Sequence, residues 1–187
     1  MKIEKKPQVT FYPCPVVLVT SCDENAKPNI ITLSWVGVTC SDPPMIGVAI
    51  RPQRYSYQLI KKMKEFVINI PTVDVLKQTD FCGMISGQKY DKFSESGLTP
   101  EIASKVKPPL IRECPVNLEC ILKNAIKLGT HDLFLGEIVS VHIDSNVLNE
   151  KGDIDYSKLS PIIYMPEEYW SLGKRLGVYG FSRKTSK

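Results

Sequence analysis

The sequence lacks several features that would place it in common functional classes. Its longest apolar run, residues 45–50, is about six residues long, whereas a membrane-spanning helix needs about 20. It contains no G-x-G-x-x-G motif and no G-x-x-x-x-G-K-[ST] motif, which argues against a Rossmann or P-loop nucleotide site. None of its six cysteines forms a C-x-x-C pair, so zinc-ribbon and thioredoxin-like sites are not expected.

The N-terminus, MKIEKKP, has no apolar segment behind its lysines, so no secretory signal and no membrane association are expected. We therefore predict a cytoplasmic protein whose cysteines are reduced thiols. The two histidines, His131 and His142, have no cysteine at ligand spacing, and no metal site is predicted.

Positive charge is concentrated at the C-terminal end. The 187 residues have a formal net charge of +4, but the part after residue 169 holds five basic residues and no acidic one. The rest of the chain therefore sums to about −1, whereas a nucleic-acid-binding protein needs a basic stripe on a folded face. We expect a solvated basic tail and no nucleic-acid partner. The basic residues of this tail are Lys174, Arg175, Arg183, Lys184 and Lys187.

Short apolar segments dominate the chain and predict strands. The predicted strands are residues 15–20, 29–35, 45–50, 66–70, 116–122, 131–143 and 162–164. Helical spacing predicts helices over 54–64, with Ser56 as N-cap, and over 73–82, and residues 83–113 are expected to be rich in loops.

Alternation in the second half of the chain favours antiparallel pairing. Residues 116–122 alternate almost cleanly, whereas the alternation of 131–143 shifts near Gly136 and predicts a β-bulge there. The expected fold is mainly β, an antiparallel barrel or sandwich with peripheral helices. A single domain is expected over residues 1–187, with its core at about 11–165 and the basic tail after about 169.

Polar residues interrupt one predicted strand. Asn29, Thr32 and Ser34 precede Trp35, and an asparagine amide can pair with a planar heteroaromatic edge. Trp35 offers a flat apolar surface with one N–H donor. The alternative is ordinary polarity at a strand edge beside a core tryptophan.

The segment Arg51–Ser56 leads from an apolar strand into a helix. A helix start presents free N–H groups, and arginine and serine side chains add donors, so this segment is a candidate phosphate cradle. The alternative is a capping serine beside two solvated arginines. Taken alone, Lys92 and His131 are more typical of solvated or packing residues.

Taken in order, these motifs resemble the flavin reductase-like family of FMN-binding split barrels, most closely its flavoredoxin branch. The matching segments extend over about residues 11–165. They are 29–35 (NIITLSW), 41–44 (SDPP), 51–56 (RPQRYS), 66–71 (FVINIP), 86–87 (SG), 91–93 (DKF), 96–98 (SGL) and 128–137 (LGTHDLFLGE).

The resemblance implies a six-stranded antiparallel split barrel of Greek-key character that forms a homodimer with FMN near the interface. It implies that Asn29, Thr32 and Trp35 follow the isoalloxazine and ribityl chain, with Ser34 in the same strand, and that Arg51 and Ser56 hold the phosphate. It further implies that Thr39, Cys40 and Ser41 line the same pocket, and that Lys92, His131 and Tyr164 close it around the ring.

The expected function is that of an FMN-binding flavoprotein that accepts electrons and passes them on through bound FMN. One alternative is an NAD(P)H:flavin oxidoreductase that uses flavin as a substrate. Another is a non-catalytic barrel with a vestigial pocket. The motifs identify no nicotinamide pocket, and they identify neither the electron donor nor the acceptor.

Overall fold

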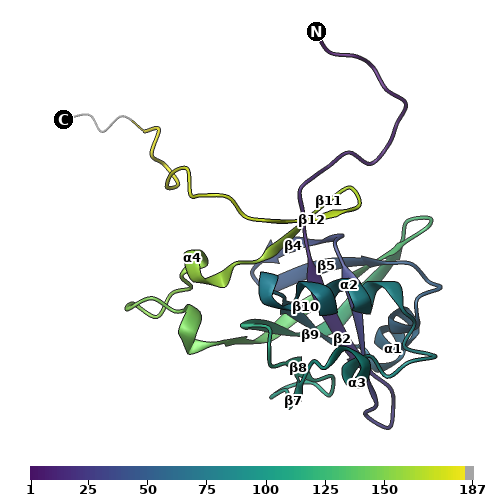
Figure 1. The fold of residues 1–187 in the computed structure, drawn as a ribbon. Helices are drawn as coiled ribbons and strands as arrows, with labels where there is room; N and C mark the ends of the chain where they lie inside the picture. Colours follow the sequence, from purple (N-terminus) through teal and green to yellow (C-terminus); the bar gives the residue numbers. More distant parts are fainter. Residues whose placement is uncertain (184–187) are drawn as a thin grey trace.

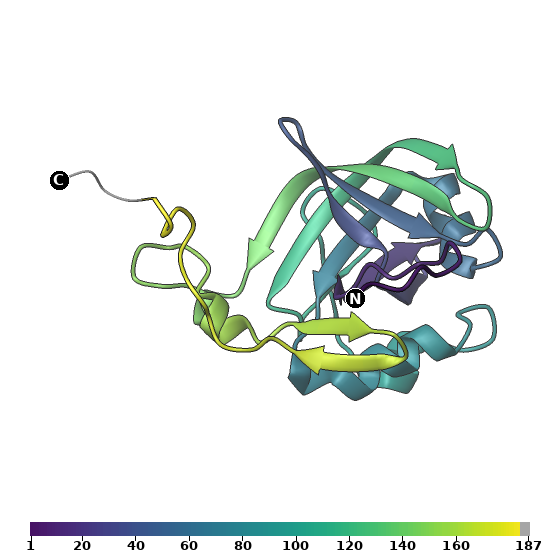
Figure 2. The same cartoon turned by 90° about the horizontal axis from the view of Figure 1, so that it is seen from above.

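The largest element of the computed structural model, which describes residues 1–183, is an antiparallel seven-stranded sheet of order β3-β2-β6-β9-β10-β5-β4. Figures 1 and 2 show this sheet curled into a half-open barrel, with the β4–β5 hairpin extending beyond one end. Its strands are β2 (Val17–Cys22), β3 (Pro28–Leu33), β4 (Val36–Ser41), β5 (Pro44–Ile50), β6 (Glu65–Ile70), β9 (Val116–Lys127) and β10 (Asp132–Ile143).

Smaller elements surround this barrel. A three-stranded sheet of order β1-β11-β12 runs beside helix α2 (Figure 2), and a two-stranded sheet pairs β7 with β8. The strands are β1 (Cys14–Pro15), β7 (Pro100–Glu101), β8 (Leu110–Ile111), β11 (Ile162–Met165) and β12 (Glu168–Ser171). The helices are α1 (Tyr55–Met63), α2 (Leu76–Met84), α3 (Lys92–Ser96) and α4 (Tyr156–Leu159), with 3-10 turns η1 (Val73–Val75) and η2 (Ser145–Val147). No helix within residues 1–183 is long and apolar enough to cross a membrane.

The sheet separates two apolar clusters. Val17 and Val19 of β2 point into the barrel, where they join Phe66 and Phe134. Leu18, between them, points outward into a cluster with residues of α2 and α3. Because a strand turns successive side chains to opposite faces, β2 is buried on both sides along its whole length, including the polar residues Thr20 and Ser21. The predicted class, a mainly β antiparallel barrel with peripheral helices, is confirmed.

Several local predictions were wrong. Strand β4 was not predicted, although Val36, Val38 and Cys40 alternate ahead of the Asp42–Pro43 turn. Strand β12 lies where the tail was expected to begin, and it pairs with β11. Lys184 and Lys187 of the predicted basic tail lie outside the residues that the structure describes.

The irregularity predicted near Gly136 is present, but the extra residue is on the other strand. Leu135 pairs with Asn124 and Gly136 with Leu122, so Lys123 of β9 bulges. A second shift between Ile138 and Ser140 leaves one extra residue in β10 and changes the alternation there.

Gly136→Ala is expected to lower the free energy of unfolding by about 1–3 kcal/mol, the usual cost of overpacking a core. A β-carbon at this position would lie 2.4 Å from Phe66 Cζ and 3.3 Å from Cys120 Cβ, and both neighbours are buried. Urea unfolding followed by tryptophan fluorescence measures the effect. Gly37→Ala is the matched control, because a β-carbon there meets nothing within 4 Å. Equal unfolding midpoints for the two variants would contradict this account.

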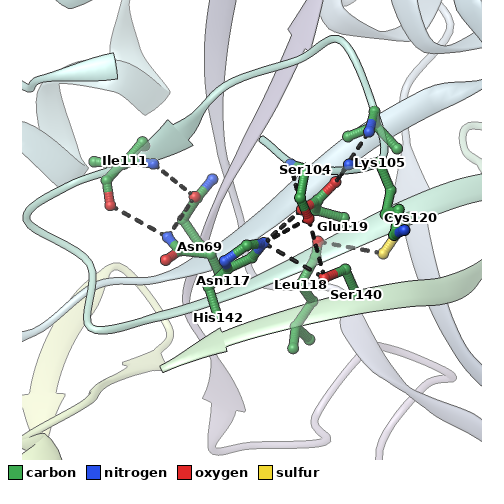
Figure 3. A network of polar contacts seen from close by, with 11 residues as sticks. Asn69, Ser104, Lys105, Ile111, Asn117, Leu118, Glu119, Cys120, Ser140 and His142 are labelled. Atoms are coloured by element: carbon green, nitrogen blue, oxygen red, sulfur yellow. Dashed lines mark hydrogen bonds and ion pairs between the residues drawn. The ribbon is translucent and has the colours of Figure 1, made fainter. Parts of the chain in front are cut away.

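A buried carboxylate attaches the loop after β7 to the sheet (Figure 3). Glu119 of β9 is fully buried, and its Oε1 accepts hydrogen bonds from the backbone N–H of Ser104 at 2.9 Å, from Ser104 Oγ at 2.7 Å and from His142 Nε2 at 2.5 Å. Its Oε2 accepts from the backbone N–H groups of Lys105 at 2.6 Å and Val106 at 2.9 Å. Burial alone would raise the pKa of Glu119, but the hydrogen bonds from Ser104, His142 and Lys105 lower it to about 2.

Candidate functional site

Two adjoining cavities lie between β3, the start of α1 and the segment after α2. The Ser56 cavity, of about 170 Å³, and the His131 cavity, of about 100 Å³, share Ile31, Arg54 and Gly83 in their walls. The Ser56 cavity is further lined by Asn29, Gln53, Tyr55, Ser56, Ile85, Ser86, Gly87 and Lys92. The His131 cavity is further lined by Thr32, Leu33, Ala49, Arg51 and His131.

Ser56 and Asn29 form the floor of the Ser56 cavity. Ser56 lies in the first turn of α1, and Arg54, not Ser56, occupies the N-cap position, which corrects the predicted cap. Asn29 Nδ2 donates to Ser56 Oγ at 2.7 Å, and both residues are buried. The hydroxyl hydrogen of Ser56 can therefore be donated to a group in the cavity.

The side-chain amide oxygen of Asn29, Oδ1, is a buried polar atom without a hydrogen-bond partner among residues 1–183. It lies so close to the α2–α3 connection that a β-carbon on Gly87 would be only 1.8 Å from it. Buried polar atoms are rarely left unpaired, so this one indicates a ligand group in the cavity.

Lys92 lies in the same cavity and is only 4% exposed. Its Nζ donates to the backbone carbonyls of Ile30 at 2.7 Å and Cys82 at 2.6 Å, so it connects β3 to the C-terminal turn of α2. Burial lowers the pKa of Lys92 to about 8, and the nearby charge of Arg54 acts in the same direction. An anion in the cavity would oppose this shift.

An aromatic pair lies next to the His131 cavity. The rings of Trp35 and His131 have centroids 4.3 Å apart, and Trp35 is 39% exposed. Arg51 Nε donates to His131 Nε2 at 3.3 Å, so His131 is neutral, with its hydrogen on Nδ1 directed to Thr130 Oγ1 at 3.0 Å. Burial and the charges of Arg51 and Arg54 lower the pKa of His131.

The charged side chains that line the two cavities are all basic. Arg51, Arg54 and Lys92 line them, and within residues 1–183 no carboxylate does. The first-turn N–H groups of α1 add a positive dipole end. This arrangement favours an anion beside the exposed face of an aromatic pair.

The structure brings together part of the predicted site. Asn29, Ser56 and Lys92 line one cavity, while Thr32, Arg51 and His131 line the other. Lys92, predicted to lie beside the ring with His131, is instead in the Ser56 cavity, and Arg51, predicted beside Ser56, contacts His131.

The remaining predicted residues lie elsewhere. Thr39, Cys40 and Ser41 are near the end of the β4–β5 hairpin, and Ser34 lies between β3 and β4. Tyr164 belongs to β11, where its ring centroid is 6.1 Å from those of Tyr12 and Tyr169. Neither these five residues nor Trp35, whose ring contacts His131, lines either cavity.

The sequence placed Arg54 in the candidate cradle segment and Ser86 and Gly87 in a matching segment, but it assigned none of the three to the FMN site. Arg54 is part of the predicted cradle segment, and its position at the start of α1 was the available signal. Ser86 and Gly87 are separated from Asn29 by more than 50 residues, and only the packing of the α2–α3 connection on β3 brings them into one cavity.

Comparison with known proteins connects this site to a family. Residues 9–173 match the family model for the flavin reductase like domain. An uncharacterized protein of Archaeoglobus fulgidus is 40% identical over 146 residues, which are 78% of this chain and 81% of that protein.

Solved structures similar to this chain are consistent with the family match. The flavoredoxin of Desulfovibrio vulgaris (Miyazaki F) superposes with a TM-score of 0.91 at 34% identity, covering 97% of this chain and 99% of that one. The flavoredoxin from Methanosarcina acetivorans gives a TM-score of 0.89 at 33% identity, covering 98% of both chains. These likenesses support a flavin-related redox function, and the chain belongs to the flavin reductase-like family of split barrels.

Proposed function

We propose that the protein binds FMN and passes electrons through it, with the phosphate in the Ser56 cavity and the ring system toward Trp35 and His131. The observation that carries this proposal is the adjacency of a cationic cavity to an aromatic pair. The similarity to two flavoredoxin structures supports the same cofactor. When bound, FMN would supply the redox chemistry, and the protein would supply binding and orientation.

The side chains fit the groups that FMN presents. Arg54, Lys92 and the hydroxyl of Ser56 are donors for a phosphate. The unpaired oxygen of Asn29 can accept from a hydroxyl or N–H group of the flavin. In this arrangement Arg51 keeps His131 neutral, so permanent charges on arginine, rather than a titrating imidazole, determine the field near the ring.

A visible spectrum of the purified protein, recorded before and after addition of NADH, tests the proposal. A flavin spectrum with one FMN per chain that persists through gel filtration supports a carrier. FMN that is readily lost, together with NADH oxidation, indicates the flavin oxidoreductase instead. A colourless protein that does not bind added FMN contradicts both and indicates a vestigial pocket.

FMN is expected to bind more tightly than riboflavin, because the donors of the Ser56 cavity act on the phosphate. Ser56→Ala is expected to weaken FMN binding by about 1–2 kcal/mol, the scale of one hydrogen bond to a charged group, and to leave riboflavin almost unchanged. Quenching of flavin fluorescence measures both affinities. Ser94→Ala, at an exposed position of α3, is the control. Equal affinities for FMN and riboflavin in the parent protein would refute the phosphate assignment.

We also propose that the protein is a homodimer. Val141 and Ile143 of β10 are 52% and 37% exposed, and Trp35 is 39% exposed, so apolar side chains beside the barrel remain available for a second copy. Light scattering is expected to give twice the chain mass of 21.0 kDa at micromolar concentration. A mass near that of one chain would count against the dimer.

A further inference from the structure

A buried hydrogen bond joins the chain neighbours of two residues that line the cavities. Tyr57 follows Ser56 in α1, and Asp132 follows His131 at the start of β10. The hydroxyl of Tyr57 donates to Asp132 Oδ2 at 2.6 Å, and the two side chains are 4% and 5% exposed. This bond joins residues that are 75 positions apart, each next in the chain to a residue that lines one of the cavities.

The surroundings of this pair favour a fixed geometry. The centroid of the Tyr57 ring lies 5.0 Å from that of the Phe134 ring, and both residues belong to the barrel core. Lys61 Nζ donates to the Tyr57 hydroxyl at 3.4 Å and lies over the ring, 5.4 Å from its centroid. The hydrogen bond to Asp132 raises the pKa of Tyr57, so the phenol keeps its proton and remains the donor.

We infer that Tyr57 and Asp132 are a positioning pair that sets the spacing between the anion end and the ring end of the site. This inference rests on the proposed function, in which FMN spans both cavities. A ligand that reaches both ends gains its full affinity only when they are held at the right separation. A ligand that occupies one end alone does not depend on that separation.

The affinities for three ligands therefore distinguish this role from a general loss of stability. FMN occupies both ends of the proposed site, lumiflavin occupies only the ring end, and inorganic phosphate occupies only the anion end. Tyr57→Phe keeps the packing against Phe134 and removes only the hydroxyl. We expect it to weaken FMN by about tenfold, the scale of one lost buried hydrogen bond, while lumiflavin and phosphate change by less than about twofold. Fluorescence quenching measures the flavins, and phosphorus NMR measures phosphate.

Variants of Asp132 test the same hydrogen bond from its acceptor side, also if Tyr57→Phe folds poorly. Asp132→Ala is expected to show the same selective loss, whereas Asp132→Asn retains an acceptor for Tyr57 and should restore most of the FMN affinity. Tyr169→Phe is the matched control, because Tyr169 donates to Asp80 at 3.1 Å in another tyrosine–aspartate pair that lines neither cavity.

The possible results are distinct. An unchanged FMN affinity in Tyr57→Phe and Asp132→Ala, or an equal weakening of all three ligands, overturns the positioning role but leaves the proposed function intact. A parent protein that binds neither FMN nor lumiflavin overturns the proposed function, and this inference with it.

Discussion

Glu119→Ala is expected to lower the free energy of unfolding by about 3–5 kcal/mol, the usual cost of breaking a buried charged network. The substitution removes the buried acceptor for three consecutive backbone N–H groups, from Ser104 to Val106, and leaves these donors without that partner. It also deprives His142 of the carboxylate shown in Figure 3. Chemical unfolding at neutral pH, followed by circular dichroism, measures the loss.

The same carboxylate predicts sensitivity to acid. Its pKa is about 2 in the folded protein, against an ordinary value of 4.5, so it contributes stability above pH 4.5 that is lost as the pH falls through 2. A difference of this size corresponds to roughly 3 kcal/mol. Glu119→Gln, which cannot ionise, should be less stable than the parent at pH 7 and should lack this part of the acid dependence. Parallel pH profiles for the parent and Glu119→Gln would contradict the account.

Gly87→Ala is expected to weaken FMN binding by about 5- to 140-fold. A β-carbon at position 87 would lie 1.8 Å from Asn29 Oδ1 and 2.7 Å from Asn29 Cγ, so either the loop or the amide must move. Asn29 contacts Ser56, so movement of its amide also removes a partner from the phosphate donor. Clashes of this kind typically cost about 1–3 kcal/mol, which is enough for the expected loss of affinity.

A double-variant comparison identifies the cause. Asn29→Ala removes the group with which the new β-carbon collides. Adding Gly87→Ala to Asn29→Ala should therefore weaken FMN far less than adding it to the parent. If the two substitutions weaken FMN binding independently, the contact between Gly87 and Asn29 is not what limits the cavity.

Sequence patterns predicted the buried strands better than the edges of the fold. Apolar segments such as residues 45–50 and 66–70 are unambiguous because both faces of these strands are covered. Strand β4 is an edge strand with mostly exposed residues, so its sequence carries little apolar signal. Strand β12 is short and exposed, and its pairing with β11 depends on a turn between them.

The candidate site was predictable in its residue types but not in their grouping. The resemblance named Asn29, Ser56, Lys92 and His131, which the structure places along two cavities. It could not place Lys92 in one cavity with Ser56, because that grouping depends on how the α2–α3 segment packs on β3. The same holds for Gly87, whose importance is visible only from the space around its backbone.

The outer edge of β3 is covered by side chains and helices instead of another strand. Among residues 1–183, strand β3 pairs only with β2. Lys92 Nζ donates to the carbonyl of Ile30, and Thr32 Oγ1 donates to the carbonyl of Thr79 in α2. Strands β6 and β9, by contrast, have a hydrogen-bonded neighbour on each side. Local opening at β3 therefore costs less free energy than opening the centre of the sheet. For the proposed FMN site we therefore expect flavin to exchange through local displacement of α2 and α3 while the barrel stays folded, so that the rate of exchange and the rate of global unfolding are set by different barriers.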